Sequence, residues 1–344
     1  PEMLVEFFVD LGEKPYRARQ IMGWAYQRGV VNFNEMTNLS LRLRQRLELV
    51  ASLSLPKIIR REISRDGTCK WVLDVGAGQA VETVYIPEPN RATLCISSQA
   101  GCAMDCSFCA TGRRGFNRNL SAAEILGQVV LVNQDLGTDS AVTNVVFMGM
   151  GEPLYNYENV SRALRIVMDG EGIALSKRKI TLSTAGVVPL IERCGQELGV
   201  NLAVSLHAVT DDLRNIIVPI NKKYPIAELL DACRNYPSGK NSRRITFEYV
   251  MLKGINDSVS DAKQLVKMIA GIPAKINLIP FNPWPNSPYE CSNHDQIKKF
   301  SDIINNAGYA SPVRKTRGQD IMAACGQLKS TSVKLRKSTL RKSL

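Results

Sequence analysis

Three cysteines in the first half of the chain have a spacing that suits an iron–sulfur cluster. Cys102, Cys106 and Cys109 form the pattern Cys-x-x-x-Cys-x-x-Cys within one short stretch. A [4Fe–4S] cluster normally takes four cysteine ligands, so three thiolates leave one iron free to chelate a second molecule. A zinc finger is a poorer match, because no second Cys-x-x-Cys or His-x-x-x-His pair follows at the required spacing. The remaining alternative is three half-buried cysteines that pack as small hydrophobic side chains.

The composition limits the kind of protein that can carry this loop. The chain has 344 residues, with 44 Lys and Arg against 32 Asp and Glu, a formal net charge of +12. This length suffices for a full hydrophobic core, and the positive charge favours a polyanionic partner over a basic protein that has none. Nine cysteines, no signal peptide and no apolar run of membrane length predict a cytoplasmic protein that binds no membrane.

Hydrophobic periodicity divides the chain into four parts. Residues 1–52 carry helical apolar stripes with basic residues opposite, which indicates a small helical domain that contacts RNA; the alternative is a plain solvated face. Residues 53–90 change to a period of two around the turn Arg65-Asp66-Gly67, which predicts an antiparallel β-meander as an extension. Residues 91–328 form the main domain. Residues 329–344 contain six Lys or Arg and no acid, so we expect a basic, disordered tail.

The main domain alternates short apolar strands with amphipathic helices. Six alternating units predict an α/β fold in which a parallel sheet curves into a partial (β/α)6 barrel. Functional groups of such barrels lie at the C-terminal ends of the strands, and the cysteine loop directly follows the first strand. The six predicted strands are 93–97, 144–148, 179–184, 201–206, 245–251 and 275–279.

Four motifs in a fixed order carry a resemblance to a known family. They are Thr-Leu-Cys-Ile-Ser-Ser-Gln at 93–99, the cysteine loop, Met-Gly-Met-Gly-Glu-Pro-Leu at 148–154 and Ala-Ala-Cys-Gly-Gln-Leu at 323–328. With them the chain resembles, over nearly its whole length, the RlmN-type dual-specificity RNA methyltransferases of the radical S-adenosylmethionine (SAM) superfamily. The resemblance implies a radical SAM barrel that methylates C2 of adenosine in 23S rRNA and tRNA. It also implies one [4Fe–4S] cluster chelated by SAM, two SAM molecules per turnover, a reductant such as a flavodoxin-type electron donor, and a monomer.

The resemblance places a cofactor site at the predicted strand ends. Gly151 allows the backbone to approach a ligand closely, and Glu152 can accept hydrogen bonds from the ammonium group of SAM. The alternative for this motif is a βα turn with an exposed glutamate. By resemblance, the remaining SAM contacts come from Ser183, Ser205, Leu206, His207 and Asn282.

Two further cysteines stand outside the cluster triplet. The resemblance implies that Cys325 is methylated by one SAM and supplies the carbon, and that Cys95 then releases the product by a transient disulfide with Cys325. C2 of adenine is electron-poor and cannot attack the sulfonium of SAM, which favours a radical route. In that route a carbon radical on Cys325 adds to C2, a base removes the C2 proton, and the Cys95 thiolate attacks the sulfur. Glu82 is the candidate base, because its stretch matches the acid-bearing strand of the family. The alternative is a surface glutamate on a hairpin.

Two other functions stay open at this point. A C8-adenosine methyltransferase of the same superfamily, which acts on rRNA, shares the cluster loop and both lone cysteines. A non-methylating iron–sulfur RNA-binding protein would need neither the Gly-Glu-Pro motif nor the cysteine pair. In each case the target base must leave its stack to enter a barrel, and phosphate contacts are expected from Arg113, Arg114, Arg118, 177–179 and 222–223.

Overall fold

The computed structural model describes residues 1–137, 141–237 and 245–329. Apart from Lys329, the predicted basic tail therefore lies outside the described residues. Among those residues, no helix is both long and apolar enough to span a bilayer.

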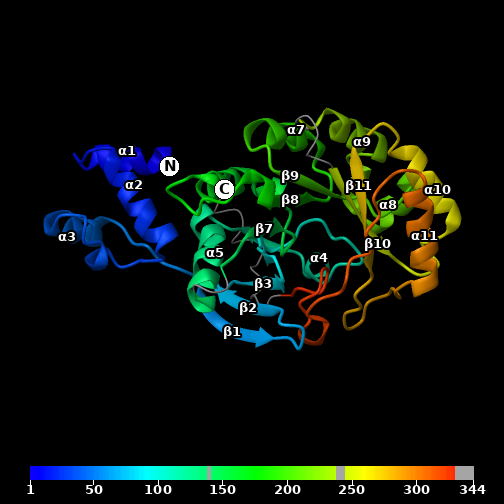
Figure 1. Ribbon diagram of the computed structural model, residues 1–344, viewed down its shortest axis with the longest axis horizontal. Coiled ribbons are helices and arrows are strands. Elements are labelled where there is room, and N and C mark those ends of the chain that lie inside the picture. The colour runs from blue at the N-terminus through cyan, green and yellow to red at the C-terminus, as the bar shows by residue number, and fades with distance from the viewer. Residues whose placement is uncertain (138–140, 238–244, 330–344) are drawn as a thin grey trace.

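The first fifty residues form a helical unit with its own small core (Figure 1, blue). Phe8, Met36 and Leu43 are buried at its centre. Ser40 begins the last helix as an N-cap, because its side chain accepts a hydrogen bond from the Leu43 N–H at 3.3 Å. The helical pattern predicted for this part of the chain is confirmed. The helices are α1 (Glu2–Asp10), α2 (Tyr16–Met22), which continues into a π-helical turn (Gly23–Gln27), and α3 (Leu41–Val50).

Among the described residues that follow, one sheet has nine strands in the order β1-β2-β3-β4-β7-β8-β9-β10-β11. The meander strands are β1 (Lys57–Ile63), β2 (Cys69–Asp74) and β3 (Ala80–Glu88). The barrel strands are β4 (Arg91–Cys95), β7 (Asn144–Phe147), β8 (Ile180–Thr184), β9 (Asn201–Ser205), β10 (Ile245–Met251) and β11 (Ala274–Pro280). The six predicted strands are confirmed to within two residues at each end.

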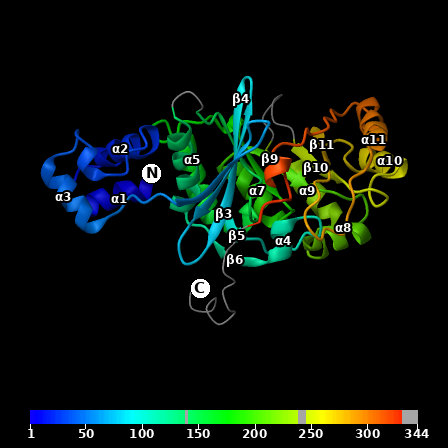
Figure 2. The ribbon, with the colours of Figure 1, turned by 90° about the horizontal axis from the view of Figure 1, so that it is seen from below.

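The meander is joined directly to the barrel. Strand β3 pairs antiparallel with β4, while β4 and the five strands after it are all parallel. The predicted meander therefore continues the barrel sheet, and Figure 2 shows it crossing the middle of the molecule.

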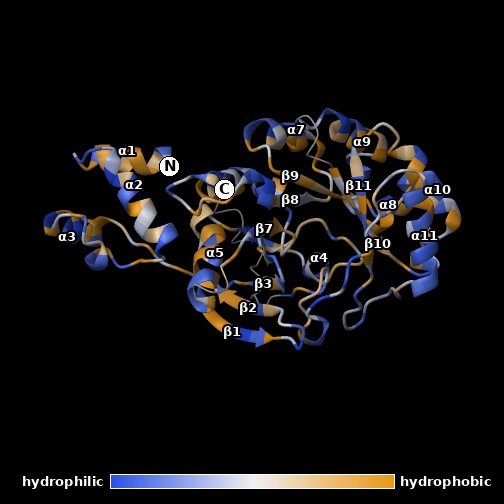
Figure 3. Cartoon of the chain, in the orientation of Figure 1, coloured by the Kyte–Doolittle hydropathy of each residue, from blue (hydrophilic) through white to orange (hydrophobic). Residues whose placement is uncertain are grey.

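Helices lie along the outside of the curved parallel sheet (Figures 1 and 2). Figure 3 shows α10 and α11 with hydrophobic and hydrophilic stretches side by side, as amphipathic helices have. A capping box starts α5, since Ser121 and Glu124 bond reciprocally. The helices are α5 (Ala122–Leu136), α6 (Tyr157–Met168), α7 (Val188–Glu197), α8 (Asp211–Ile217), α9 (Ile226–Asn235), α10 (Val259–Met268) and α11 (His294–Asn306).

A separate two-stranded sheet frames the cysteine loop. It consists of β5 (Gln99–Gly101) and β6 (Phe116–Asn119), with the short helix α4 (Ala110–Arg114) between them. The two ends of the loop are in close contact, because a Cβ at Gly101 would lie 2.0 Å from the carbonyl oxygen of Gly115. Gly101 also has φ of 80°, so only glycine fits there without strain. The backbone segments before and after the cysteine loop therefore lie in direct contact.

Candidate active site

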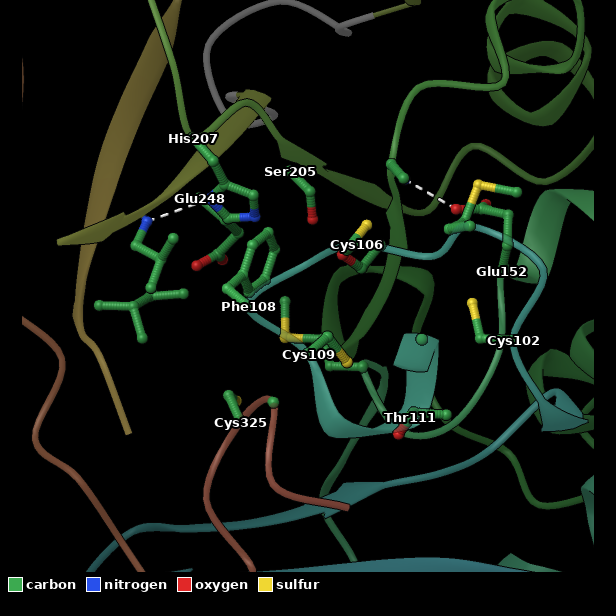
Figure 4. A pocket seen from close by; sticks show the side chains of 18 of the residues that line it. Cys102, Cys106, Phe108, Cys109, Thr111, Glu152, Ser205, His207, Glu248 and Cys325 are labelled. Carbon is green, nitrogen blue, oxygen red and sulfur yellow. Dashed lines mark hydrogen bonds between the residues drawn. The ribbon is translucent and has the colours of Figure 1, made fainter. Parts of the chain in front are cut away.

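The cysteine triplet lines a cavity at the C-terminal ends of the parallel strands (Figure 4). The cavity has a volume of about 150 Å³. Backbone bonds hold the loop, from Cys102 N–H to the Gly115 oxygen and from Cys109 N–H to the Cys106 oxygen, each 3.0 Å long. Burial raises the pKa of all three thiols, that of Cys102 to about 12. A cationic ligand is therefore needed to stabilise the thiolates.

The three thiols fit a [4Fe–4S] cluster better than a single metal ion. Among the described residues, no group of three His, Cys, Asp or Glu side chains is arranged to hold one ion. A cuboidal cluster does not need such convergence, because each thiolate binds a different iron. The rest of the cavity wall includes Glu152, Ser205 and His207. The donor set therefore suits a cluster, and these polar groups lie in the same cavity.

Glu152 is held rigidly at the edge of this cavity. Its carboxylate accepts hydrogen bonds from the backbone N–H of Ala185 at 2.7 Å and of Leu154 at 3.1 Å. Burial nevertheless raises the pKa of Glu152 to about 7. The side chain is 3% exposed, so the alternative of an exposed turn glutamate is wrong. A buried carboxylate with a raised pKa suits a cationic partner such as an ammonium group, which would stabilise its ionised form.

Most of the other residues predicted to contact SAM meet at the same cavity. Ser183, Ser205, His207 and Asn282 all line it. Leu206 does not: its side chain is fully buried in the core, and its backbone N–H and oxygen bond Glu248 and Arg214. The structure therefore brings four of these five residues together.

His207 presents a fixed hydrogen-bond donor to the cavity. Its Nδ1 accepts a hydrogen bond from the Val250 N–H at 3.0 Å, and its ring packs edge-on against Phe108 with centroids 4.6 Å apart. Burial lowers the pKa of the imidazole to about 3, so the ring is neutral. Because Nδ1 is the acceptor, the proton of the neutral ring resides on Nε2.

Cys95 and Cys325 line a second, larger cavity of about 460 Å³. Cys325 and Asn282 line both cavities, so the two spaces adjoin at these residues. Asn282 Nδ2 donates to the Cys325 backbone oxygen at 3.3 Å. All nine cysteines lie within the described residues and are free thiols, so the transient disulfide stays a prediction. Burial and the nearby Cys325 raise the pKa of the Cys95 thiol to about 12, and Arg314 opposes the shift.

Two charged residues that line the second cavity were not predicted from the sequence. Glu248 lies in the middle of the fully buried strand β10, where its Oε2 accepts a hydrogen bond from Asn277 at 2.8 Å. Arg314 also lines both cavities, and its backbone N–H bonds the Leu278 oxygen at 2.8 Å. A glutamate inside an otherwise uncharged strand is a signal that could have revealed Glu248. Arg314 follows the last strand and has no comparable signal.

Glu82 occupies a neighbouring position on β3. Val84, Ile86 and Glu88, which share its face by strand alternation, line the second cavity, whereas Glu82 lines neither cavity. Its side chain is 2% exposed, so the alternative of a surface glutamate is wrong. Burial raises the pKa of Glu82, while Lys70, whose Nζ lies 3.5 Å from the carboxylate, opposes the shift.

Arg118, one of the expected phosphate contacts, has protein partners instead. Its guanidinium bonds both carboxylate oxygens of Glu124, at 2.9 and 2.7 Å, and the Val75 oxygen at 2.6 Å. This arrangement links β6 to α5 and to the residue that follows β2, which indicates a structural role for the side chain.

Comparisons with known proteins agree with this geometry. The model for the ribosomal RNA large subunit methyltransferase N-terminal domain matches residues 1–53, and the radical SAM superfamily model matches residues 96–268. The dual-specificity RNA methyltransferase RlmN of Parvibaculum lavamentivorans is 59% identical, over 94% of this chain and 84% of its own length. That of Agrobacterium fabrum is 55% identical, over 98% of this chain and 87% of its own length.

A solved structure extends the comparison to three dimensions. The radical SAM methyltransferase from Sphaerobacter thermophilus shares 44% sequence identity, with a TM-score of 0.89 over 95% of this chain and 96% of that one. The curated relatives and the solved structure match both the helical N-terminal unit and the barrel, since each covers almost the whole chain. The chain therefore belongs to the RlmN family of dual-specificity RNA methyltransferases, within the radical SAM superfamily.

Proposed function

We propose that this protein methylates C2 of adenosine in rRNA and tRNA through an S-methylcysteine formed on Cys325. The observation that carries the proposal is the position of Cys325, which lines both the cavity of the cluster cysteines and the cavity of Cys95. A thiol at this junction can receive a methyl group from one side and present it to a base on the other. The names of the relatives, which are dual-specificity RNA methyltransferases, support the same reaction class.

The first cavity is the proposed cofactor site. Cys102, Cys106 and Cys109 would hold one [4Fe–4S] cluster, which together with SAM supplies the one-electron chemistry that activates the methyl group. Glu152 would bind the ammonium group of SAM beside Gly151, and neutral His207 would donate from Nε2. Ser183, Ser205 and Asn282 offer the remaining polar contacts. Cys325 would accept a methyl group from one SAM, and a second SAM would supply the radical chemistry at the loaded methyl group, which makes two SAM molecules per turnover.

The chain's own residues would complete the transfer in three steps. The S-methyl group of Cys325 would lose one hydrogen atom to the radical chemistry that the cluster and SAM supply, and its carbon would form a bond to C2 of the adenine. Glu82 would take the proton that leaves C2, while one electron returns to the cofactor site. The Cys95 thiolate would then attack the Cys325 sulfur, so that the sulfur–carbon bond breaks, a disulfide forms, and the released carbon takes up a proton to complete the methyl group of the base. A reductant restores the two thiols. Reducing equivalents from a flavodoxin-type donor, and a monomeric protein, stay predictions.

The second cavity is the proposed entrance for the target base. Five cationic residues line it along with the two lone cysteines: Arg91, Lys275, Arg314, Lys315 and Arg317. Positive side chains around a cavity that contains the reacting thiols suit the phosphates that flank a flipped nucleotide. This lining supports a nucleic acid as the substrate.

Mapping the methyl group in the RNA tests the proposal. The reconstituted protein is incubated with SAM, a low-potential reductant, and a 23S rRNA fragment or tRNA. Digested nucleosides are then identified by mass spectrometry. We expect 2-methyladenosine in both RNAs. A methyl group at C8 would identify the sister activity, and RNA without any new methyl group would leave a non-methylating iron–sulfur RNA-binding protein.

A further inference from the structure

Arg214 on α8 is a fully buried cation with an unusual set of partners. Its side chain is 0% exposed. Nε donates to the Leu206 oxygen at 3.0 Å, and Nη2 donates to the oxygens of Ala185 at 2.7 Å and Ser205 at 2.9 Å. Nη1 donates to Asn221 Oδ1 at 2.8 Å. All four acceptors are neutral, and no carboxylate among the described residues forms an ion pair with this guanidinium.

An uncompensated buried charge costs free energy, so a structure that retains one needs an opposite charge nearby. Asp211 is connected to the guanidinium only through Asn221, whose Nδ2 donates to Asp211 Oδ1 at 2.8 Å. Burial lowers the pKa of Arg214 to about 10, and a thiolate at Cys106 of the cysteine loop opposes this shift more than Asp211 does.

The backbone places α8 directly against that loop. The N–H of Ser107, the residue after Cys106, donates to the oxygen of Ile217 at the end of α8, at 3.2 Å. The three carbonyls bonded by Arg214 belong to the segments that follow β8 and end β9. Those segments also carry Glu152's partner Ala185 and the cavity residues Ser205 and His207. Arg214 therefore bonds the backbone of residues at the cofactor site, and its own side chain does not line the cavity.

We propose that Arg214 is the internal counter-charge of the cluster and its thiolates, and that it also positions the strand ends that bind SAM. The inference rests on the proposed function, because it assumes a cluster on the three cysteines. A fixed positive charge favours the state with one more electron, so Arg214 makes the cluster easier to reduce. Its four hydrogen bonds hold Ser205 and Ala185 in place, so it contributes to SAM binding through them.

The reduction potential of the reconstituted full chain tests the charge. Arg214→Met is titrated with dithionite as the one-electron donor and compared with wild type and with Arg234→Met. Arg234 on α9 is a matched control, because its side chain is 43% exposed and already paired with Asp231. We expect the equilibrium constant for reduction to fall about tenfold in Arg214→Met, which is about 59 mV more negative for one electron, and to stay unchanged in the control. An unchanged potential at full iron content would overturn the inference.

A second pair of variants decides the matter if Arg214→Met does not fold. Asn221→Asp leaves the guanidinium in place but puts a carboxylate on the oxygen that accepts from Nη1. Asn221→Ala removes the same hydrogen bond without adding charge. We expect the negative shift in Asn221→Asp only, and equal potentials in the two variants would also overturn the inference.

Separate measurements keep the two proposals apart. Arg214→Lys retains the charge but cannot reach all four acceptors, so we expect a near wild-type potential with SAM binding weakened several-fold. Wild-type SAM binding in this variant would remove the positioning role. Failure of the wild-type chain itself to bind iron would contradict the proposed function, whereas a normal cluster with no charge effect contradicts only the role of Arg214.

Discussion

Lys329 donates its backbone N–H to Oε2 of Glu82 at 2.7 Å, although 247 positions separate the two residues. Lys70 joins the same contact, with Nζ 3.5 Å from Oε1 of Glu82 and 2.5 Å from the Ile321 backbone oxygen. Asp66 and Ser64 of the same meander bond Gly318 and Asp320. Hydrogen bonds from the meander therefore hold the segment that carries Cys325 at positions before and after this cysteine in the sequence. The proposed base and the proposed methyl carrier belong to one connected unit.

Removal of the Lys70 ammonium is expected to loosen this unit. In Lys70→Met the Glu82 carboxylate keeps its burial but loses its cationic partner, which costs about 3 kcal/mol of folding stability. The Ile321 oxygen also loses its donor, so Cys325 is held less firmly and methyl loading becomes slower. Denaturant unfolding and mass spectrometry of the Cys325 peptide measure the two effects.

A matched control separates this local effect from a general loss of charge. Lys298→Met removes a lysine of which the side chain is 65% exposed and paired with Asp302. We expect it to change stability by less than about 1 kcal/mol and to leave methyl loading normal. Equal behaviour of the two variants would show that Lys70 does not hold the Cys325 segment.

Glu82→Gln tests the proposed base. The amide oxygen can still accept from Lys329, so the fold should survive, but the group can no longer take the C2 proton. We expect product formation to fall by about a hundredfold or more and covalent protein–RNA adduct to accumulate. Glu192→Gln, an exposed glutamate on α7, should behave as wild type. A Glu82→Gln variant with normal turnover would require another base.

The pH profile gives an independent test of the same residue. Burial raises the pKa of Glu82, and a general base works only when ionised. The single-turnover rate should therefore fall as the pH drops through this raised pKa, at a higher pH than for an ordinary glutamate. This acid limb should be absent from the residual activity of Glu82→Gln.

The sequence predicted the parts of the structure that depend on local pattern. The six parallel barrel strands are apolar runs of regular spacing, and the cysteine triplet and the Gly-Glu-Pro motif are each contained in a few residues. The short strands β5 and β6 have three and four residues, too few for a periodic signal.

The buried charges were not predictable in the same way. Arg214 and Lys70 are polar residues that a helix or an exposed hairpin would turn toward solvent, yet both are buried here. Their partners come from Ala185, Leu206 and Ile321, which only the tertiary structure brings to them. Hydrophobic periodicity indicates which face of a helix or strand is buried. It carries no information on which distant residue a buried side chain will contact. The division into four parts, and all residue roles, remain predictions.

Each cysteine of the triplet should be essential for iron binding. Anaerobic reconstitution is expected to give about four irons per chain, and Cys102→Ala, Cys106→Ala or Cys109→Ala should lose most of them. Cys194→Ala, which changes a buried cysteine on α7, is the control and should keep them. Iron analysis with visible absorption measures the outcome. Full iron content in all three triplet variants would exclude the proposed cluster site.

SAM affinity should depend on pH through Glu152. Its pKa is raised to about 7 by burial, and only the ionised form attracts the ammonium group of SAM. The affinity should therefore be constant well above pH 7 and fall by up to about tenfold per unit below it, because protonation then competes with binding. Equilibrium dialysis with labelled SAM between pH 5.5 and 8.5 measures this, and Glu152→Gln should bind weakly without the pH dependence. An unchanged profile in Glu152→Gln would assign the dependence to another group.

The two lone cysteines should fail in different ways, because the proposed mechanism gives them different roles. Cys325→Ala has no methyl acceptor, so we expect neither methylated RNA nor covalent adduct. Cys95→Ala can still add the methyl carbon to C2, but no thiolate is left to attack the Cys325 sulfur. RNA should therefore accumulate on the protein as a slow band on a denaturing gel, which ribonuclease removes. Cys233→Ala, a buried cysteine on α9, should show normal turnover and no adduct.

The pH dependence of product release identifies the attacking thiol further. Burial raises the pKa of Cys95 to about 12, so at neutral pH only a small fraction is thiolate, and that fraction grows about tenfold per pH unit. Release of RNA from the wild-type adduct should accelerate by about tenfold per pH unit between pH 7 and 9, while the adduct on Cys95→Ala should persist at every pH. Two merely structural thiols would lower the stability of both variants and give an adduct in neither. Turnover of Cys95→Ala at the wild-type rate, without adduct, would eliminate Cys95 as the group that frees the methylated RNA.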